Sequence, residues 1–533
     1  MVHPPAQAIE GGALMFRLSI AALCLGCLAS LAYPFIGTKG GWFVDEKGRV
    51  LILRGLNVSG SSKSPPFLPW QSKEDLLWIK EQGFNCVRYL VLWEAIEPEP
   101  GRYDETYLEK VAERLDWLRE AGLKVILDMH QDLYSRRYGG DGAPEWACLD
   151  DKTPFEPLPG VPWFFNYLSP AVVKAFDSFW ANRPGPDGVG IQDRFIRMWQ
   201  HLASRFKDDP NIIGYDLLNE PFYGSYIYRM MGELMEAIGQ ELPDIGSEMD
   251  LKEMISDPQT YLVRFRDTIR KLLDSGRLFD LLDSASRPAQ QFERECLQPF
   301  YDRITAAIRE VDPNHIIFYE TAGGSMSGTK IPMEPYRPRD NRGRPFQNVA
   351  LSPHFYDFSS DFGTPYSGTE EYIYTFLKRA VDVGERINVP VWFGEWGTWP
   401  PQSERPDGRL LVEHHLNSFD RLVVGWAFWE YYGEEFKRSS IIPLITRPYA
   451  QAIAGEPVEM RCSENSFRLT FIPKSESETV IWVPKRYEVE VKVEVEGGKA
   501  EARRDEDGYV RVKSSPQTRR CTVILRWSPT KEF

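Results

Sequence analysis

The sequence predicts an α/β protein that combines a (β/α)8 TIM barrel with a C-terminal antiparallel β-sandwich. Three observations lead to this prediction. A length of 533 residues is more than one compact domain usually holds. Between about residues 41 and 448, eight short apolar runs alternate with long amphipathic stretches. After Pro448 the runs shorten and alternate apolar with polar side chains. Apolar runs that alternate with amphipathic stretches are typical of parallel strands joined by helices. Short runs that alternate apolar with polar side chains are typical of antiparallel strands.

The eight apolar runs are the expected barrel strands. They cover residues 51–56, 86–92, 124–129, 213–218, 315–319, 349–355, 391–394 and 424–429. Segments with helical periodicity, such as 74–82 and 107–121, lie between them, and Gly83 and Gly122 are typical helix stops. Eight strands favour a closed barrel over an open sheet, and the C-terminal ends of barrel strands carry the chemistry.

The expected domain boundaries follow from these patterns. The barrel should cover residues 33–448, with a helical insertion at about 224–298, and the sandwich should cover 449–533. Five sandwich strands are expected, at residues 467–472, 479–483, 487–495, 509–513 and 521–527. Cys462 and Cys521 fall at the starts of sandwich strands, so we predict a disulfide between them in an exported chain; the alternative is two buried thiols.

Residues 1–32 predict a secretory signal with an N-terminal extension. Counted from Met15, Arg17 is the positive flank and residues 18–32 form an apolar run that is short for a membrane span. Leu25-Gly26-Cys27 faintly resembles a lipoprotein cleavage site, which leaves retention or lipidation as the alternative. We therefore expect a secreted, extracellular protein or one anchored to a membrane through this segment.

Composition narrows the classes of partner. The net charge is −14 and no basic block is present, which argues against nucleic acid and against electrostatic docking to an anionic membrane. At most a weak association with a membrane surface is expected. The five cysteines after residue 32 show no CxxC or Cys/His spacing, so no metal site is predicted. We expect a monomer.

Polar side chains gather where the expected strands end. The third strand ends in Asp-Met-His-Gln-Asp at 128–132, the fourth in Asn219-Glu220-Pro221, the sixth in His354-Phe355-Tyr356 and the seventh in Gly394-Glu395. Arg88 lies on the second strand and Trp429 closes the eighth. A lone strand-end glutamate is as often a salt-bridge partner. Two carboxylates across a barrel mouth, however, match glycoside cleavage, which needs one protonated and one ionised carboxyl group.

The order Arg88, Asn219-Glu220-Pro221, His354 with Tyr356, Glu395 and Trp429 resembles glycoside hydrolase family 5. Within that family the sequence is most similar to the endoglycoceramidases. The segments that carry this resemblance are RGLN at 54–57, SSKS at 61–64, DMHQD at 128–132, GAPEWA at 142–147, AFDSFW at 175–180, YDLLNEP at 215–221 and RPY at 447–449.

The resemblance implies a role for each matching residue. Glu220 would be the acid/base and Glu395 the nucleophile, with carboxyl groups ~5–5.5 Å apart for a retaining reaction. Arg88 and Asn219 would orient Glu395 and bond the sugar 2-hydroxyl, and Tyr356, beside His354, would keep Glu395 ionised. The glucose next to the scissile bond would be held by Lys63, His130, Asp132 and Trp429.

The resemblance also implies an activity that needs no cofactor. The favoured function is a retaining hydrolase that cuts the β-glucosyl bond between glycan and ceramide in glycosphingolipids, so the partner is a glycolipid substrate. The alternatives are an exo-acting β-glucosidase on glucosylceramide or steryl glucoside, an endoglucanase on β-glucan, and an inactive barrel that binds glycans or lipids. The family's strand-eight tryptophan further predicts a cis peptide bond between Trp429 and Glu430.

The insertion at about 224–298 departs from the family pattern. An apolar stripe rich in methionine runs from Met230 to Leu242, and a second stripe runs from Tyr261 to Leu273. Two interpretations stay open. Either the two helices bury their stripes against each other, or the methionines offer an apolar wall to a lipid tail at the barrel mouth.

Overall fold

The computed structural model describes residues 35–58, 60–159, 161–241, 264, 267, 268, 271, 272, 276–284, 286–323, 334–515 and 517–528. The predicted signal therefore lies outside the described residues, and the chain from Phe35 onward forms one compact unit. Within the described part, no helix combines the length and the apolar character that a membrane crossing requires.

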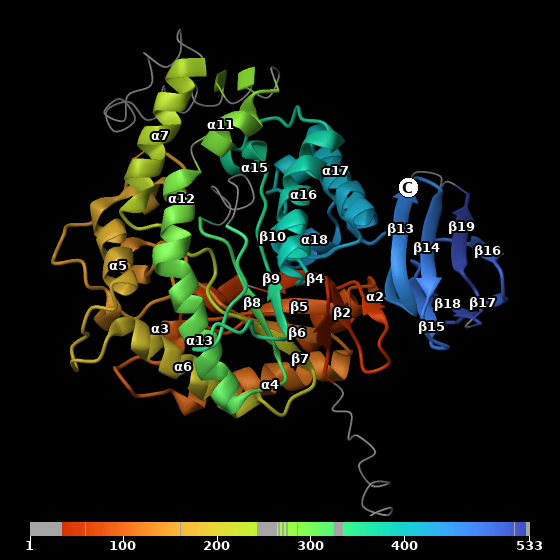
Figure 1. Cartoon of the computed structure of the whole chain (residues 1–533), viewed down its shortest axis with the longest axis horizontal. Helices are drawn as coiled ribbons and strands as arrows, with labels where there is room; N and C mark the ends of the chain where they lie inside the picture. Colours follow the sequence, from red (N-terminus) through yellow and green to blue (C-terminus); the bar gives the residue numbers. More distant parts are fainter. Residues whose placement is uncertain are drawn as a thin grey trace, which may run out of the picture. The chain divides into compact units, whose positions relative to one another are not determined.

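Eight parallel strands form the predicted barrel (Figure 1). Their ring order is β10-β11-β4-β5-β6-β7-β8-β9, and parallel bridges from Leu351 to Val391 and from His354 to Glu395 join β9 to β10. The strands are β4 Arg54–Val58, β5 Cys86–Val91, β6 Lys124–Met129, β7 Ile212–Asp216, β8 Ile316–Tyr319, β9 Val349–Leu351, β10 Trp392–Trp396 and β11 Gly425–Phe428. Every residue of β4, β5 and β10 is buried, which explains why these strands are continuous apolar runs.

Amphipathic helices follow the strands and cover the barrel from outside (Figure 1). The longest are α4 Glu105–Ala121, α6 Ile191–Phe206, α16 Glu370–Ile387 and α17 Pro406–Leu422; α2 Lys73–Glu81, α3 Trp93–Ile96, α5 Pro170–Trp180 and α13 Gln298–Val311 complete the set. Ser72 and Asp75 form a capping box at the start of α2. Gly122 ends α4 in the left-handed conformation, as the sequence predicted.

Shorter helices build the loops. The α-helices are α7 Tyr226–Glu241, α11 Leu278–Ser284, α12 Arg287–Phe292, α15 Phe358–Phe362, α18 Glu434–Lys437 and α19 Ile442–Ile445. The 3-10 helices are η1 Gly60–Lys63, η2 Arg136–Tyr138, η3 Glu145–Ala147, η4 Trp163–Leu168 and η6 Gln402–Glu404, and η5 Glu293–Leu297 is a π-helix. Helices η1 and η4 place residues at the barrel mouth.

Two antiparallel sheets form the predicted C-terminal sandwich. One has the order β13-β14-β19-β16, with β13 Gly455–Ser463, β14 Ser466–Pro473, β19 Arg520–Trp527 and β16 Val489–Glu496. The other has the order β1-β2-β3-β12-β15-β18-β17. Its C-terminal strands are β12 Tyr449–Ile453, β15 Glu478–Trp482, β18 Tyr509–Ser514 and β17 Ala500–Arg504. Phe467, Leu469, Ile481 and Val512 belong to a core separate from that of the barrel.

Three strands of this second sheet precede the barrel in the chain, which the sequence analysis did not anticipate. They are β1 Gly37–Lys39, β2 Trp42–Val44 and β3 Val50–Leu51. Strand β3 lies beside β12, with Leu51 opposite Ala452 and Val50 opposite Ile453. Residues before and after the barrel therefore build one sheet.

The predicted disulfide between Cys462 and Cys521 is wrong. Both residues are free thiols in the same sheet. Strand β14 lies between their strands, since Cys462 pairs with Phe467 and Cys521 pairs with Phe471. The two residues are two strand spacings apart, ~10 Å, and are also offset by four residues along β14, ~13 Å, which is beyond the Cα–Cα reach of ~7 Å for a disulfide.

The methionine stripe of the insertion packs inward where it is described. Met230 and Ile238 of α7 are buried in the barrel core cluster, and Met231, Leu234 and Met235 pack against it. Helix α7 contacts α11 and α12. Most of the second stripe, together with Leu242, lies outside the described residues. The described part of the first stripe therefore packs on the core, and the predicted pairing of the two stripes lies outside the described residues.

Candidate active site

The C-terminal ends of the barrel strands open into a cavity of about 720 Å³. Its lining combines polar and aromatic side chains. The polar lining residues include Lys63, His130, Asp132, Asp141, Asn219, Glu220, Ser360, Asp361, Glu395 and Glu430. The aromatic lining residues include Trp163, Phe164, Tyr356, Trp399 and Trp429. No described residue between 224 and 298 lines this cavity.

Arg88 lies at the centre of the polar floor and is fully buried on β5. Its guanidinium contacts four carboxylates at 2.7–3.1 Å: Asp128, Asp216, Glu320 and Glu395. It also donates to Asn219 Oδ1 at 2.9 Å. Burial works against the charge, but the four carboxylates raise the pKa of Arg88 well above its usual value. Arg88 is therefore a permanent cation that fixes this floor.

Glu395 is buried at the end of β10 and is held by two donors. Arg88 Nη1 donates to its Oε1 at 2.7 Å, and Tyr356 Oη donates to its Oε2 at 3.0 Å. Burial and the neighbouring carboxylates raise the pKa of Tyr356 well above its usual value, so the phenol stays a donor. The two contacts fix both carboxylate oxygens of Glu395 in place.

Glu220 follows β7 and faces Glu395 across the cavity. Its backbone has a φ of 47°, a left-handed conformation that costs a non-glycine residue energy and is found mainly where the surroundings enforce it. His354 Nδ1 lies 2.8 Å from Glu220 Oε1. One oxygen of Glu220, one of Glu395 and a ring nitrogen of His354 lie within 4.8 Å of one another. Two carboxyl groups this close fit the geometry of double displacement.

Glu320 belongs to this group of carboxylates and was missed by the sequence analysis. It follows β8 directly and is 2 % exposed. It accepts from Arg88 Nη2 at 3.1 Å and from the backbone N–H of Glu220 at 2.9 Å, and His354 Nε2 lies 3.3 Å away. Its position directly after β8 was the available signal, as was the position of Asp216 at the end of β7.

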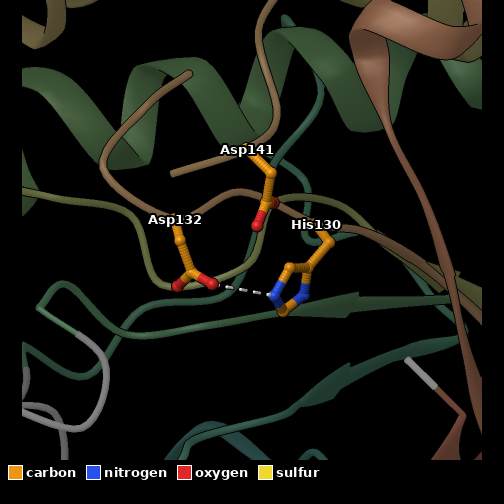
Figure 2. A group of neighbouring side chains, drawn as sticks. All are labelled: His130, Asp132 and Asp141. Atoms are coloured by element: carbon orange, nitrogen blue, oxygen red, sulfur yellow. Dashed lines mark ion pairs between the residues drawn. The ribbon is translucent and has the colours of Figure 1, made fainter. Parts of the chain in front are cut away.

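A second polar cluster lies on the far side of Trp429. Figure 2 shows His130, Asp132 and Asp141, with the His130 ring turned toward the Asp132 carboxylate at 3.6 Å. Lys63 forms an ion pair with Asp132 and lies 3.9 Å from Asp141 Oδ2. The ammonium group lies over the Trp429 ring, 4.6 Å from its centroid, and the His130 ring stacks on the same indole.

The charges in this cluster depend on one another. Burial and Lys63 oppose a charge on His130, but Asp128 and Asp132 prevail and raise its pKa to about 10. Burial would raise the pKa of Asp132, yet Lys63 and His130 hold it well below the usual range. Burial raises the pKa of Asp141 to about 7, against the pull of Lys63. Among the described residues, Asp141 Oδ1 and His130 Nε2 have no hydrogen-bond partner. The cluster thus presents both donors and acceptors to the cavity, as hydroxyl-rich ligands require.

Aromatic side chains also line the rim of the cavity. Trp163 on η4 is 52 % exposed, and Trp399 is 40 % exposed and stacks on Tyr356 with centroids 5.7 Å apart. Phe164 packs edge-on against Phe362 of α15. Apolar surface left in water at the mouth of a polar cavity indicates a ligand with an apolar part.

The structure brings together all ten residues that the sequence singled out. Glu220, Glu395, Arg88, Asn219, His354 and Tyr356 form one contact network, and Lys63, His130, Asp132 and Trp429 form the neighbouring one. The predicted cis peptide bond between Trp429 and Glu430 is present. The sequence analysis did not select several polar residues of the site, among them Asp141, Asp216, Glu320 and Glu430.

Comparisons with known proteins agree with this geometry. The family model described as cellulase (glycosyl hydrolase family 5) matches residues 44–249 and 281–435. A second model, the glycoside hydrolase family 5 C-terminal domain, matches residues 447–524. Together these matches span the barrel and most of the sandwich.

Named relatives cover most of the chain. Endoglycoceramidase I of Rhodococcus hoagii is 25% identical over 509 residues, which cover 91% of this chain and 85% of the relative. Glucosylceramidase of Rhizopus delemar is 32% identical over an alignment of 625 residues. The alignment covers 84% of this chain and 89% of the relative.

Solved structures are similar in fold over the same extent. Endo-glycoceramidase II from Rhodococcus sp., in complex with ganglioside GM3, has a TM-score of 0.71 and 26% identity and covers 92% of this chain and 100% of its own. The lactosyl-enzyme intermediate of that enzyme has a TM-score of 0.67 and 26% identity, with 91% and 99% covered.

Proposed function

Because this chain belongs to glycoside hydrolase family 5 and is a glycosidase, we propose that its substrate is a glycosphingolipid. The reaction is hydrolysis of the β-glucosyl bond between glycan and ceramide, with net retention at the anomeric carbon. The observation that carries this proposal is the approach of Glu220 and Glu395 within 4.8 Å. Inverting enzymes hold their carboxyl groups ~6.5–9.5 Å apart to admit a water molecule between them and the sugar.

The two carboxyl groups divide the reaction between them. Glu395, held by Arg88 and Tyr356, attacks the anomeric carbon and forms a glycosyl-enzyme ester. Glu220 gives its proton to the glycosidic oxygen, and ceramide leaves as the alcohol. A water molecule then gives a proton to Glu220 and its oxygen to the anomeric carbon, which releases the sugar and restores both carboxyl groups.

The remaining site residues hold the sugar. Lys63, His130 and Asp132 present donors and an acceptor around the Trp429 ring, which suits a glucose whose C–H face stacks on the indole while its hydroxyls bond the polar groups. Arg88 and Asn219 lie beside Glu395, where a sugar 2-hydroxyl would sit. Each of these assignments is a proposal that substitution can test.

The lipid assignment is supported by the aromatic rim and by the relatives. Trp163, Phe164 and Trp399 leave apolar surface exposed at the cavity mouth. Burial of that surface by the ceramide chain would stabilise the complex by ~25 cal/mol per Å². Three of the compared proteins act on, or are named for, ceramide-linked sugars.

Product analysis on four substrates tests the proposal. Purified protein is incubated with lactosylceramide, glucosylceramide, a steryl glucoside and cellotetraose, and products are identified by thin-layer chromatography and mass spectrometry. We expect intact lactose and ceramide from lactosylceramide, and no products from the Glu395→Gln variant. Cleavage of cellotetraose with all three glycolipids left intact would overturn the lipid assignment and indicate an endoglucanase.

A second candidate is an exo-acting β-glucosidase on glucosylceramide. The Rhizopus delemar relative, named a glucosylceramidase, is 32% identical to this chain, whereas endoglycoceramidase I of Rhodococcus hoagii is 25% identical. The same experiment separates the two functions, because an exo-acting enzyme releases glucose from glucosylceramide and leaves lactosylceramide uncut. The steryl glucoside arm tests whether the apolar group must be ceramide.

We also propose that residues 15–32 direct export, from their positive flank and apolar run. Mass spectrometry of the protein produced by its host gives the mature N-terminus. A secreted chain that begins near residue 33 would support cleavage, and an intact N-terminus in a membrane pellet would support the anchored form. An intact chain in the soluble cell fraction would contradict both.

A further inference from the structure

We propose that Glu320 is a positioning residue for Glu220, and that it acts through His354 and through the Glu220 backbone. This inference rests on the proposed role of Glu220 as acid/base. Glu320 does not line the cavity, so it does not contact the sugar directly. Its effect is transmitted by the two groups that it binds, the His354 ring and the Glu220 N–H.

Two hydrogen bonds and one further ion pair converge on the Glu320 carboxylate. Oε1 faces Arg88 Nη2 at 3.1 Å and His354 Nε2 at 3.3 Å, and Oε2 accepts from the Glu220 N–H at 2.9 Å. An ionised carboxylate is an acceptor only, and no other side chain of this size can receive three donors on two oxygens. A buried carboxylate that is bonded in this way fixes its partners firmly.

His354 connects Glu320 to the acid/base side chain. Its Nε2 faces Glu320 and its Nδ1 lies 2.8 Å from Glu220 Oε1, so both ring nitrogens face carboxylates. The ring is fully buried and has little freedom, because a Cβ at Gly394 would lie 2.9 Å from Nε2. A histidine between two carboxylates holds both of its protons and donates in both directions.

The charges around His354 come from four strands or the residues that follow them. Glu220 follows β7, Glu320 follows β8 and Glu395 ends β10, with Nδ1 3.7 Å from Glu395 Oε2. Arg88 on β5 and Asp216 on β7 face the same carboxylates. Burial lowers the pKa of His354, but Glu320 and Glu395 raise it well above its usual value. Burial in turn raises the pKa of Glu320, while the His354 charge opposes this rise.

This arrangement serves the step in which Glu220 loses its proton. When Glu220 protonates the glycosidic oxygen, it becomes a carboxylate, and the Nδ1–H of the His354 imidazolium is in place to donate to it. The bond to the Glu220 N–H holds the strained backbone in register, at a φ of 47°. Loss of the Glu320 charge should therefore slow proton transfer more than attack by Glu395.

The first test measures the proton on His354 and needs no enzymatic activity. Histidine is labelled with nitrogen-15, the His354 signals are assigned with a His354→Asn variant, and the ring is titrated by NMR. In Glu320→Gln we expect His354 to lose its proton at a lower pH than in the wild type. Glu320→Asp keeps the charge and should restore the titration toward the wild type. An unchanged titration in Glu320→Gln overturns the proposal.

The second test measures kcat/KM on aryl β-glucosides with leaving groups of different acidity. In Glu320→Gln we expect a loss of about tenfold or more for poor leaving groups and little loss for activated ones, because only the former need a full proton. A loss of equal size on every leaving group would show a merely structural role and overturn the proposal. The matched control is Asp216→Asn, which removes another Arg88 carboxylate at 3.0 Å but makes no contact with the Glu220 backbone, and it should show no leaving-group trend.

Failure of the proposed function can be distinguished from failure of the role proposed for Glu320. If the wild-type protein cleaves no β-glucoside, the proposed function falls while the NMR titration still decides whether Glu320 sets the proton on His354. If Glu320→Gln does not fold, as judged by near-ultraviolet circular dichroism, Glu320→Asp carries both tests. Its shorter side chain cannot reach the Glu220 N–H from the same backbone, so the leaving-group trend should remain in part while the His354 titration returns.

Discussion

Replacement of Arg88 by methionine should destabilise the protein in a pH-dependent way. Methionine fills a similar volume but leaves Asp128, Asp216, Glu320 and Glu395 without the cation that they share at 2.7–3.1 Å. Removal of one partner from a buried ion pair costs ~3–5 kcal/mol, because the other charge stays buried and unpaired. At pH 7.5 we expect the free energy of unfolding to fall by about that amount.

The pH dependence follows from where the carboxylates take up protons. Without Arg88, at least one of them has a folded-state pKa above its unfolded value of about 4. Such a group adds stability that is fully present below the unfolded pKa and is lost as the pH rises through the folded pKa. The difference between variant and wild type should therefore shrink by ~1.4 kcal/mol per pH unit, for each proton taken up, as the pH is lowered from 7.5 toward 5.

Urea unfolding at pH 5 and pH 7.5, followed by tryptophan fluorescence and circular dichroism, measures both effects. Coincident transitions are required for a two-state treatment. Lys73→Met is the matched control, since Lys73 pairs with Glu120 on the surface and its loss should cost ~0–1 kcal/mol without a pH trend. A loss below ~1 kcal/mol for Arg88→Met at pH 7.5, or a loss that does not change with pH, would refute the reasoning.

Three further predictions concern the site and the thiols. Glu395→Gln should abolish turnover on every substrate, and full activity of this variant on any substrate would contradict the assignment. Glu220→Gln should retain activity on activated aryl glucosides, because their leaving groups need no proton. Lys63→Met should raise KM for glucosides in steady-state kinetics, because Asp132 loses its ion pair beneath the sugar; an unchanged KM would remove Lys63 from the sugar site. A reductant should leave the melting temperature of the wild type and of Cys462→Ser unchanged, and a drop in the wild type alone would mean that Cys462 is bonded after all.

The barrel and most of the site could be predicted because both leave a linear pattern in the chain. Strands such as β5 are covered on both faces and are therefore apolar apart from site residues such as Arg88, so each appears as a run. The chemistry of a barrel follows those runs directly, which placed Glu220 and Glu395 together. Glu320 also follows a run, but its importance depends on contacts with residues from three other strands.

The predictions failed where the outcome depends on which elements lie side by side in space. Periodicity shows that β13, β14 and β19 are strands, but it does not show that β14 lies between the other two and keeps Cys462 from Cys521. The strands before the barrel were missed because β1, β2 and β3 have only two or three residues, too few to show an alternation. The methionine stripe of α7 has helical spacing, yet spacing does not reveal what the helix packs against.

The pairing of β3 with β12 affects how the chain can be synthesised. Leu51 leaves the ribosome long before its partner Ala452 exists, and at ~5–20 residues per second the delay is about 20–80 s. During that interval β3 has an open hydrogen-bonding edge, of the kind that recruits other chains. A truncation after the barrel would make the exposed edge permanent, so a shortened catalytic fragment should aggregate on expression rather than behave as an independent module. Any engineering that exchanges the C-terminal sheets must therefore carry residues 37–51 along with them.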